Sequence, residues 1–210
     1  MADDGGPVPL DLAELTSVRR RGCVSAGVAV VVGAAVGGVV ALFAGQTAAL
    51  VTAAVVIVLL TSLAWVAGTR KLTLEGDRVV SRAIGRKAVD LRRVDRIELV
   101  VTDIRGTRTV GLLLTGGRRA INLALAVYSG AGGRELGILV LRRLADALAR
   151  SENTAGLVYS QLLVAQLRAE AKGDVAADRP LYRLAALLPS VRVAQRIRPE
   201  EVTRFVASLD

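Results

Sequence analysis

Four carboxylates lie close together in the sequence and are the first residues to consider for chemistry: Asp90, Asp95, Glu98 and Asp103. Carboxylates in such a group can act as general acid and base, alone or with a metal ion. The chain has no His and its single Cys is Cys23, which excludes a Cys/His zinc site, a Ser–His–Asp relay and an intrachain disulfide. The four alternate with Arg, as on a salt-bridged surface. We therefore expect no catalytic residue, no metal site and no cofactor, with a carboxylate enzyme as the alternative.

A second group of residues has the chemistry to bind an anion. Its members are basic and flank one proposed turn: Arg82, Arg86, Lys87, Arg92 and Arg93. Arginine donates bidentate hydrogen bonds to phosphate, so the pattern predicts a site for a lipid headgroup or another anion. The alternative is a solvated strand edge whose charges prevent sheet-to-sheet aggregation. Arg118 and Arg119 mark a second candidate turn.

The charge of the chain indicates which partners to expect. The formal net charge is +9, and the excess lies in residues 70–150. Each basic residue near an anionic membrane surface contributes about 1 kcal/mol of attraction, so membrane lipids are the expected ligand. Nucleic acid is not expected, because only 3% of the residues are aromatic and no nucleic-acid-binding motif is present. The alternative is an Arg-rich surface that follows from a GC-rich, actinobacterial type of composition.

The longest uncharged segment covers residues 22–69. It holds two apolar spans, 24–44 and 48–67, each about 30 Å long as a helix, which is the thickness of a bilayer's hydrocarbon core. Residues 45–47 offer a turn between them. The segment therefore predicts a transmembrane hairpin of two helices.

The residues that flank these spans predict the orientation of the hairpin. The membrane-topology anchors are Arg19, Arg20, Arg21, Trp65, Arg70 and Lys71. Under the positive-inside rule both termini face the cytoplasm, which predicts a multi-pass protein of the inner membrane. A twin-arginine signal peptide is the alternative for the N-terminal segment. Small residues at Gly33 and Gly37 favour packing of the two spans, or a dimer contact.

The period of the apolar residues changes after residue 70 to that of strands. Strands are expected at 72–74, 78–84, 87–90, 96–102 and 110–114, with one or two more in 120–128, followed by an amphipathic helix in 134–150. Short antiparallel strands followed by one helix predict a small barrel that the helix caps.

Three segments of this region carry a family resemblance. Residues 72–80 read as strand, Gly turn and strand, residues 85–87 as a basic turn, and residues 89–98 as an apolar-x-x-Val-Asp-x-Ile pattern. This arrangement resembles the opening of the bacterial PH-like domains, which commonly follow a two-span hairpin. The resemblance covers residues 70–150 and implies a seven-stranded, helix-capped barrel. It also implies binding or assembly at a membrane, without catalysis.

These observations predict an α+β protein in four parts. The parts are a cytoplasmic tail at 1–21 with a disordered start at 1–10, the hairpin at 22–69, the PH-like domain at 70–150 and a helical extension at 151–210. Helices are expected in the extension at 155–171, at 181–188 and from Pro199 onward. The predicted function is a membrane-anchored, non-enzymatic scaffold or binding module. The alternative is an accessory subunit of a transport or envelope complex, and a homo-oligomer or a membrane-protein partner is considered.

Overall fold

The structure is a computed structural model that describes residues 6–10, 12, 31–32, 34–36, 45–68, 71–83, 85–130, 132–188 and 194–209. The chain divides into two compact units. Unit 1 contains Met1–Leu12, Lys71–Ser81 and Arg86–Asp210, and unit 2 contains Ala13–Arg70 and Arg82–Gly85.

The first sheet has four strands in the order β1-β2-β3-β4. Their bounds are Val8–Pro9 for β1, Lys71–Glu75 for β2, Arg78–Ala83 for β3 and Gly85–Asp90 for β4. Leu74 of β2 and Val79 of β3 point into the core. Gly76, in the turn between these strands, has a φ of 59°, which a glycine adopts without steric penalty.

The N-terminal strand corrects one prediction. Val8 lies opposite Leu74 in an antiparallel pair, the N–H of Leu10 donates to the carbonyl of Leu72 at 2.8 Å, and Leu10 is only 1% exposed. The predicted disordered start at 1–10 is therefore wrong for residues 8–10. Val8 and Leu10 alternate around Pro9, which has no N–H and is tolerated on an edge strand.

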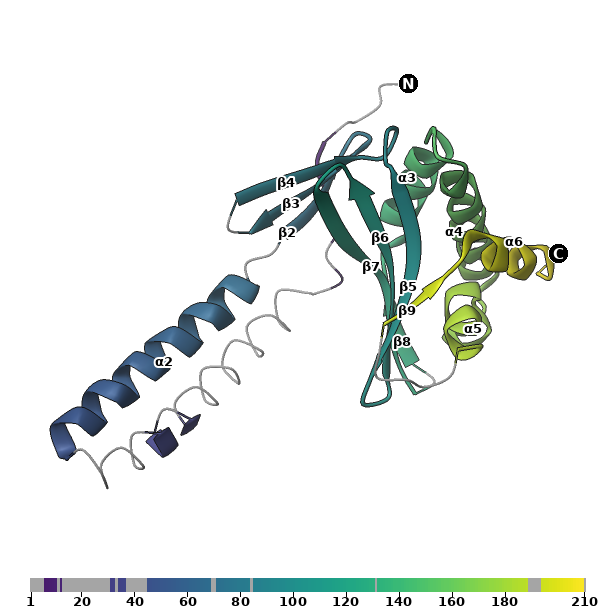
Figure 1. Cartoon of the computed structure of the whole chain (residues 1–210). Helices are drawn as coiled ribbons and strands as arrows, with labels where there is room; N and C mark the ends of the chain where they lie inside the picture. The colour runs from purple at the N-terminus through teal and green to yellow at the C-terminus, as the bar shows by residue number, and fades with distance from the viewer. Residues whose placement is uncertain are drawn as a thin grey trace. The chain divides into compact units, whose positions relative to one another are not determined.

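The second sheet has five strands in the order β8-β7-β6-β5-β9 (Figure 1). Their bounds are Arg96–Ile104 for β5, Thr107–Gly116 for β6, Arg119–Ser129 for β7, Gly132–Glu135 for β8 and Gln195–Ile197 for β9. Every pair is antiparallel. Arg105 and Gly106 connect β5 to β6 with φ values of 53° and 77°, as a two-residue type I′ turn requires.

The helices of unit 1 gather on one side of this sheet (Figure 1). Their bounds are Ile138–Ala149 for α3, Thr154–Lys172 for α4, the short 3₁₀ helix Ala176–Asp178 for η1, Pro180–Ala186 for α5 and Pro199–Ala207 for α6. Asn153 caps α4 by accepting the N–H of Ala155, and Gly173 ends it in the left-handed conformation. The helices predicted for the C-terminal extension are thus confirmed.

One apolar core joins both sheets and the helices. Leu74 of the first sheet, Leu99 of the second and Leu144 of α3 are at most 2% exposed and belong to the same cluster. Phe205 of α6 and Tyr159 of α4 join it. The hydroxyl of Tyr159 accepts the N–H of Leu99 at 3.2 Å, and burial raises the pKa of Tyr159 to about 12. The C-terminal extension therefore completes the core of the sheets.

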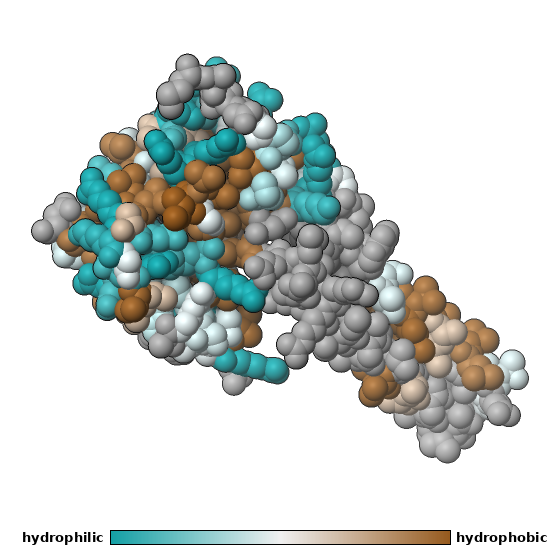
Figure 2. All heavy atoms as spheres, turned by 180° about the vertical axis from the view of Figure 1, so that it is seen from behind, coloured by the Kyte–Doolittle hydropathy of each residue, from teal (hydrophilic) through white to brown (hydrophobic). Residues whose placement is uncertain are grey.

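Some apolar side chains remain at the surface of unit 1. Figure 2 shows hydrophobic areas on this unit, bordered by hydrophilic residues. Among the described residues, Ile138 and Leu139 at the start of α3 and Leu157 of α4 are all more than half exposed. Isolated exposed apolar residues are normal on a folded protein.

The α+β class and the antiparallel sheets are confirmed, with two qualifications. The strands divide into two separately hydrogen-bonded sheets, and β1, β8 and β9 add to the strands that periodicity predicts. Helix α3 occupies the predicted place of the capping helix, although β8 takes the first residues of the predicted segment 134–150.

The second apolar span forms helix α2, Gln46–Gly68, which follows Gly45 with a φ of 85°. Among the residues that the structure describes, however, none of the helices combines the length and the apolar character that a membrane crossing requires. The predicted transmembrane hairpin at 22–69 is therefore wrong for the described part of the chain, as is the multi-pass localisation in the inner membrane.

The membrane-topology anchors were predicted from the hairpin, so they depend on it. Arg19, Arg20, Arg21 and Arg70 lie outside the described residues, and so does the side chain of Trp65. Lys71 is exposed and begins strand β2. Most of the first span, 24–44, also lies outside the described residues.

Candidate functional site

The five predicted anion-binding residues do not form one cluster. Arg86 pairs with Glu75 at 2.9 Å across the first sheet, and Arg92 pairs with Asp77 at 2.8 Å. Lys87 lies exposed on β4, Arg93 lies exposed in the loop after β4, and Arg82 is an exposed residue of unit 2. These are the positions of the five cations; their ligand stays a prediction.

A different set of cations meets at one end of the second sheet, where four segments are fastened together. The backbone N–H of Glu152 donates to the carbonyl of Arg92 at 2.9 Å, which joins the connection between α3 and α4 to the loop after β4. Asn153 donates through Nδ2 to the carbonyl of Asp95 at 2.9 Å. The Asp95 carboxylate accepts the N–H of Gly117 at 2.6 Å, which joins this loop to the β6–β7 turn.

Asp77 fastens the fourth segment, the β2–β3 turn. Its two carboxylate oxygens accept from Arg150 at 2.6 Å and from Arg92 at 2.8 Å. The hydrogen bond from Arg150 lowers the pKa of Asp77, with Arg92 adding to the effect. Since one carboxylate faces two guanidinium groups, this junction keeps a local excess of positive charge.

We call the cations at this junction the basic rim: Arg92, Arg93, Arg118, Arg119 and Arg150. Arg93, Arg118 and Arg119 are exposed, and within the described structure no hydrogen bond or ion pair engages their side chains. The rim thus unites two of the predicted anion-binding residues with the second candidate turn. Arg150 was not foreseen, because it lies 73 positions from Asp77 in the sequence.

The four carboxylates that are close in sequence are separated in the fold. Asp90 pairs with Arg78 at 3.3 Å, and Asp95 holds the β6–β7 turn. Glu98 and Asp103 lie five residues apart on β5, so about 17 Å of strand separates them.

Each of these carboxylates has a structural contact. Glu98 pairs with Arg196 of β9 at 3.1 Å, and Asp103 pairs with Arg108 at 3.3 Å. Within the described ranges, no group of three or more His, Cys, Asp or Glu residues is placed to hold a metal ion. These contacts position strands and turns.

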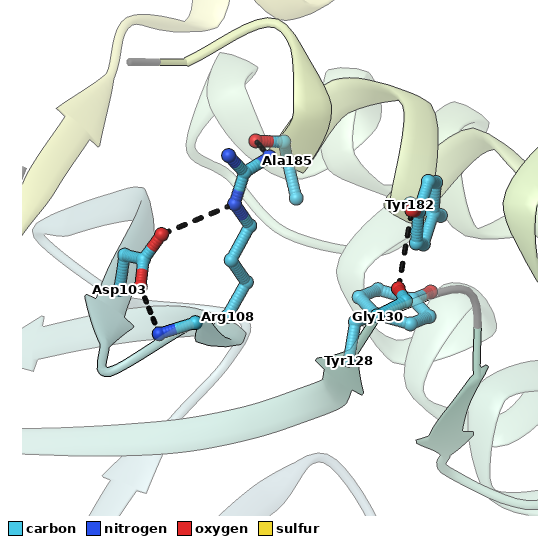
Figure 3. A pocket seen from close by; sticks show the side chains of 7 residues that line it. Asp103, Arg108, Tyr128, Gly130, Tyr182 and Ala185 are labelled. Atoms are coloured by element: carbon cyan, nitrogen blue, oxygen red, sulfur yellow. Dashed lines mark hydrogen bonds and ion pairs between the residues drawn. The ribbon is translucent and has the colours of Figure 1, made fainter. Parts of the chain in front are cut away.

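A pocket of about 280 Å³ lies at the other end of β5 (Figure 3). Its lining residues come from the β5–β6 hairpin, the end of β7 and α5: Asp103, Gly106, Arg108, Tyr128, Gly130, Tyr182 and Ala185. Arg108 donates to the carbonyl of Ala185 at 3.0 Å. In a helix, a carbonyl accepts the N–H of the residue four positions later, and for Ala185 that residue is Pro189, which has no N–H. The sequence therefore indicates that the Ala185 carbonyl needs another donor.

A buried ion pair lies beside the pocket. Glu135 of β8 accepts from Arg179 at 2.6 Å and from the hydroxyl of Tyr128 at 2.6 Å. Burial, followed by the hydrogen bond to Glu135, raises the pKa of Tyr128 above its ordinary value, and the Glu135 hydrogen bond raises the pKa of Arg179. The Tyr128 and Tyr182 rings meet edge to face, with centroids 5.1 Å apart. This network fixes α5 against the sheet.

No protein-family model, curated protein or solved structure matches this chain. The resemblance of residues 70–150 to bacterial PH-like domains therefore stays a prediction.

Proposed function

We propose that the chain is a non-enzymatic binding module whose basic rim recognises phosphate-bearing anions, with anionic lipid headgroups as the ligand. The observation that carries this proposal is the convergence of five arginines from the loop after β4, the β6–β7 turn and the end of α3. Arginine suits such a ligand because its planar guanidinium group can donate two parallel hydrogen bonds to phosphate.

The rim combines a backbone held by hydrogen bonds with exposed charges. Hydrogen bonds from Glu152, Asn153 and Gly117 hold its segments in place. Arg93 and Arg119 stay exposed and unengaged by other described residues. A preorganised backbone lowers the entropy lost on binding, and exposed arginines gain most from a neighbouring anionic surface.

The test is the binding of the full chain to lipid vesicles. Vesicles with and without anionic lipid are compared for wild type and for a rim variant with Arg93→Ala, Arg118→Ala and Arg119→Ala. At about 1 kcal/mol per arginine near the surface, the rim variant should bind anionic vesicles up to roughly a hundredfold more weakly. Binding should also fall as salt rises, because ions screen exposed charges over about 8 Å at physiological strength.

The matched control is Arg105→Ala, Arg134→Ala and Arg168→Ala. The side chains of these arginines are also exposed and make no hydrogen bond or ion pair with other described residues, and their loss changes the net charge equally. Arg105 lies at the far end of β5 from the rim, so the control variant should keep most of the binding. If both variants lose the same amount of vesicle affinity, the effect depends on net charge and not on the rim. If the wild type binds neutral and anionic vesicles equally well, it does not recognise anionic headgroups.

A further inference from the structure

The pocket between the β5–β6 hairpin and α5 has two different walls (Figure 3). Asp103 and Arg108 form one side, and Tyr128, Tyr182 and Gly130 form the other. All of these residues belong to unit 1. The Asp103 side chain is only 13% exposed, and Tyr128 is 2% exposed. A charge held in such a sheltered place interacts more strongly than one in bulk water.

The tyrosine hydroxyls and the Gly106 N–H of the lining donate to partners inside the protein. The Tyr128 hydroxyl donates to Glu135, and the Tyr182 hydroxyl donates to the carbonyl of Gly130 at 3.2 Å. The N–H of Gly106 donates to Asp103 Oδ1 at 3.1 Å. Arg108 is engaged with Asp103 and with the carbonyl of Ala185 (Figure 3).

The carboxylate and carbonyl oxygens of the lining can accept more hydrogen bonds than they receive from the lining residues. An ionised carboxylate offers about four lone-pair sites and a carbonyl offers two. Asp103 accepts two hydrogen bonds, one at each oxygen, and the Gly130 and Ala185 carbonyls each accept one from a lining side chain. These acceptor oxygens suit a ligand that donates hydrogen bonds.

The N–O distance in the Asp103–Arg108 ion pair is longer than that in the neighbouring Glu135–Arg179 ion pair. Arg108 Nε lies 3.3 Å from Asp103 Oδ2, whereas Arg179 lies 2.6 Å from Glu135. Strong charge-assisted pairs have N–O distances of about 2.7–2.9 Å. Asp103 can thus accept a second cationic donor without first breaking a tight pair.

We propose that this pocket binds a primary alkylammonium group. The ammonium donates hydrogen bonds to Asp103 and to the Gly130 carbonyl, while its alkyl chain makes apolar contacts with the rings of Tyr128 and Tyr182. A volume of about 280 Å³ is at the small end of ligand pockets and suits a chain of a few heavy atoms. A small free amine and a lysine side chain of another protein share this chemistry.

The test is a titration of the full chain with n-butylammonium, followed by the amide NMR signals of Gly106 and Gly130. We expect saturable shifts with a dissociation constant on the order of 1 mM, as a five-atom ligand allows. n-Butanol has the same chain without the charge, and it should bind at least tenfold more weakly. N-acetyl-lysine N-methylamide is the second arm: tighter binding than n-butylammonium assigns the site to a lysine side chain, and weaker binding assigns it to a free amine.

Two variants separate the site from a general effect of charge. Asp103→Asn removes the charge but keeps an oxygen for the N–H of Gly106, so n-butylammonium affinity should fall at least tenfold. Asp90→Asn removes one carboxylate from an exposed pair on β4 and should leave the affinity unchanged. Butanol binding as tightly as the amine, unshifted Gly106 and Gly130 signals, or an Asp103→Asn variant with wild-type affinity would each overturn the proposal. Tyr182→Leu provides a second readout, because it removes one ring and should weaken amine binding while Asp103 stays in place.

Discussion

The ion pair between Glu135 and Arg179 gives the sharpest energetic prediction, and the change that tests it is Glu135→Gln. The Glu135 side chain is 8% exposed and that of Arg179 is 22% exposed. Glu135 also accepts the Tyr128 hydroxyl, so one carboxylate holds β7 and the segment before α5 at once. Glutamine keeps one oxygen acceptor but loses the charge, and it turns an NH₂ group toward one of the two donors.

The size of the effect follows from this burial. Hydrogen bonds to charged groups contribute about 1.5–3 kcal/mol, and removing one partner of a buried pair costs about 3–5 kcal/mol when the other charge is left uncompensated. Arg179 keeps some access to water and donates through Nε to the carbonyl of Asp174. We therefore expect Glu135→Gln to lower the free energy of unfolding by about 2–3 kcal/mol, less than the loss of a partner in a fully buried pair. At about 2–4 °C per kcal/mol for a domain of this size, the melting temperature should fall by about 5–10 °C.

Guanidinium denaturation measures the free energy of unfolding, and Asp90→Asn is the matched control. Its partner Arg78 is 67% exposed, so this change should cost about 0–1 kcal/mol. A double-mutant cycle with Arg179→Met isolates the coupling between Glu135 and Arg179. If Glu135→Gln is no more destabilising than Asp90→Asn, or if the cycle gives no coupling, burial does not strengthen this pair and the reasoning fails.

Three further changes test other parts of the fold. Arg105→Asn should raise the free energy of unfolding by up to about 1 kcal/mol, because Asn tolerates the positive φ of a type I′ turn better than Arg does. An unchanged free energy of unfolding in denaturant titrations would contradict the assignment of strain. Gly156→Ala should destabilise the protein by about 1–3 kcal/mol, since the added methyl would lie 2.7 Å from the Leu148 carbonyl oxygen. Thermal melting measures this change. An unchanged melting temperature would mean that α4 can shift to make room for the methyl group. The hydrogen bond from Arg150 lowers the pKa of Asp77, so the stability it contributes is complete above the unfolded pKa of about 3.9 and is lost as the pH falls. Asp77→Asn should therefore lower the free energy of unfolding at pH 7. In denaturation curves recorded at a series of pH values, the difference in this free energy between variant and wild type should shrink below about pH 5.

Local patterns in the sequence predicted the elements that local physics controls. The alternation in residues 96–102 predicts strand β5, and the period of about four in residues 134–150 predicts helix α3. Pro180 and Pro199 mark the first turns of α5 and α6. These signals act over a few residues, so neighbouring side chains and turn chemistry are enough to read them.

The failed predictions concern features that depend on distant partners. Val8 and Leu10 are too few to indicate a strand until β2 is present beside them. The absence of charge and the two apolar spans in residues 22–69 predicted the hairpin, which the described helices do not bear out. Glu98 and Asp103 are close in the sequence but lie about 17 Å apart along β5, because an extended strand rises about 3.3 Å per residue.

The amino-acid sequence by itself determined the α+β class, the excess of positive charge and most strands and helices of residues 71–207, with β8 and β9 as the exceptions. Only the tertiary structure decided which charges meet, because partners such as Asp77 and Arg150, or Glu135 and Arg179, are 73 and 44 positions apart. No local pattern encodes such pairings. They arise when one apolar core fixes both sheets and the helices at once, and this core sets the arginines of the rim at one end of β5 and the pocket of Asp103 at the other.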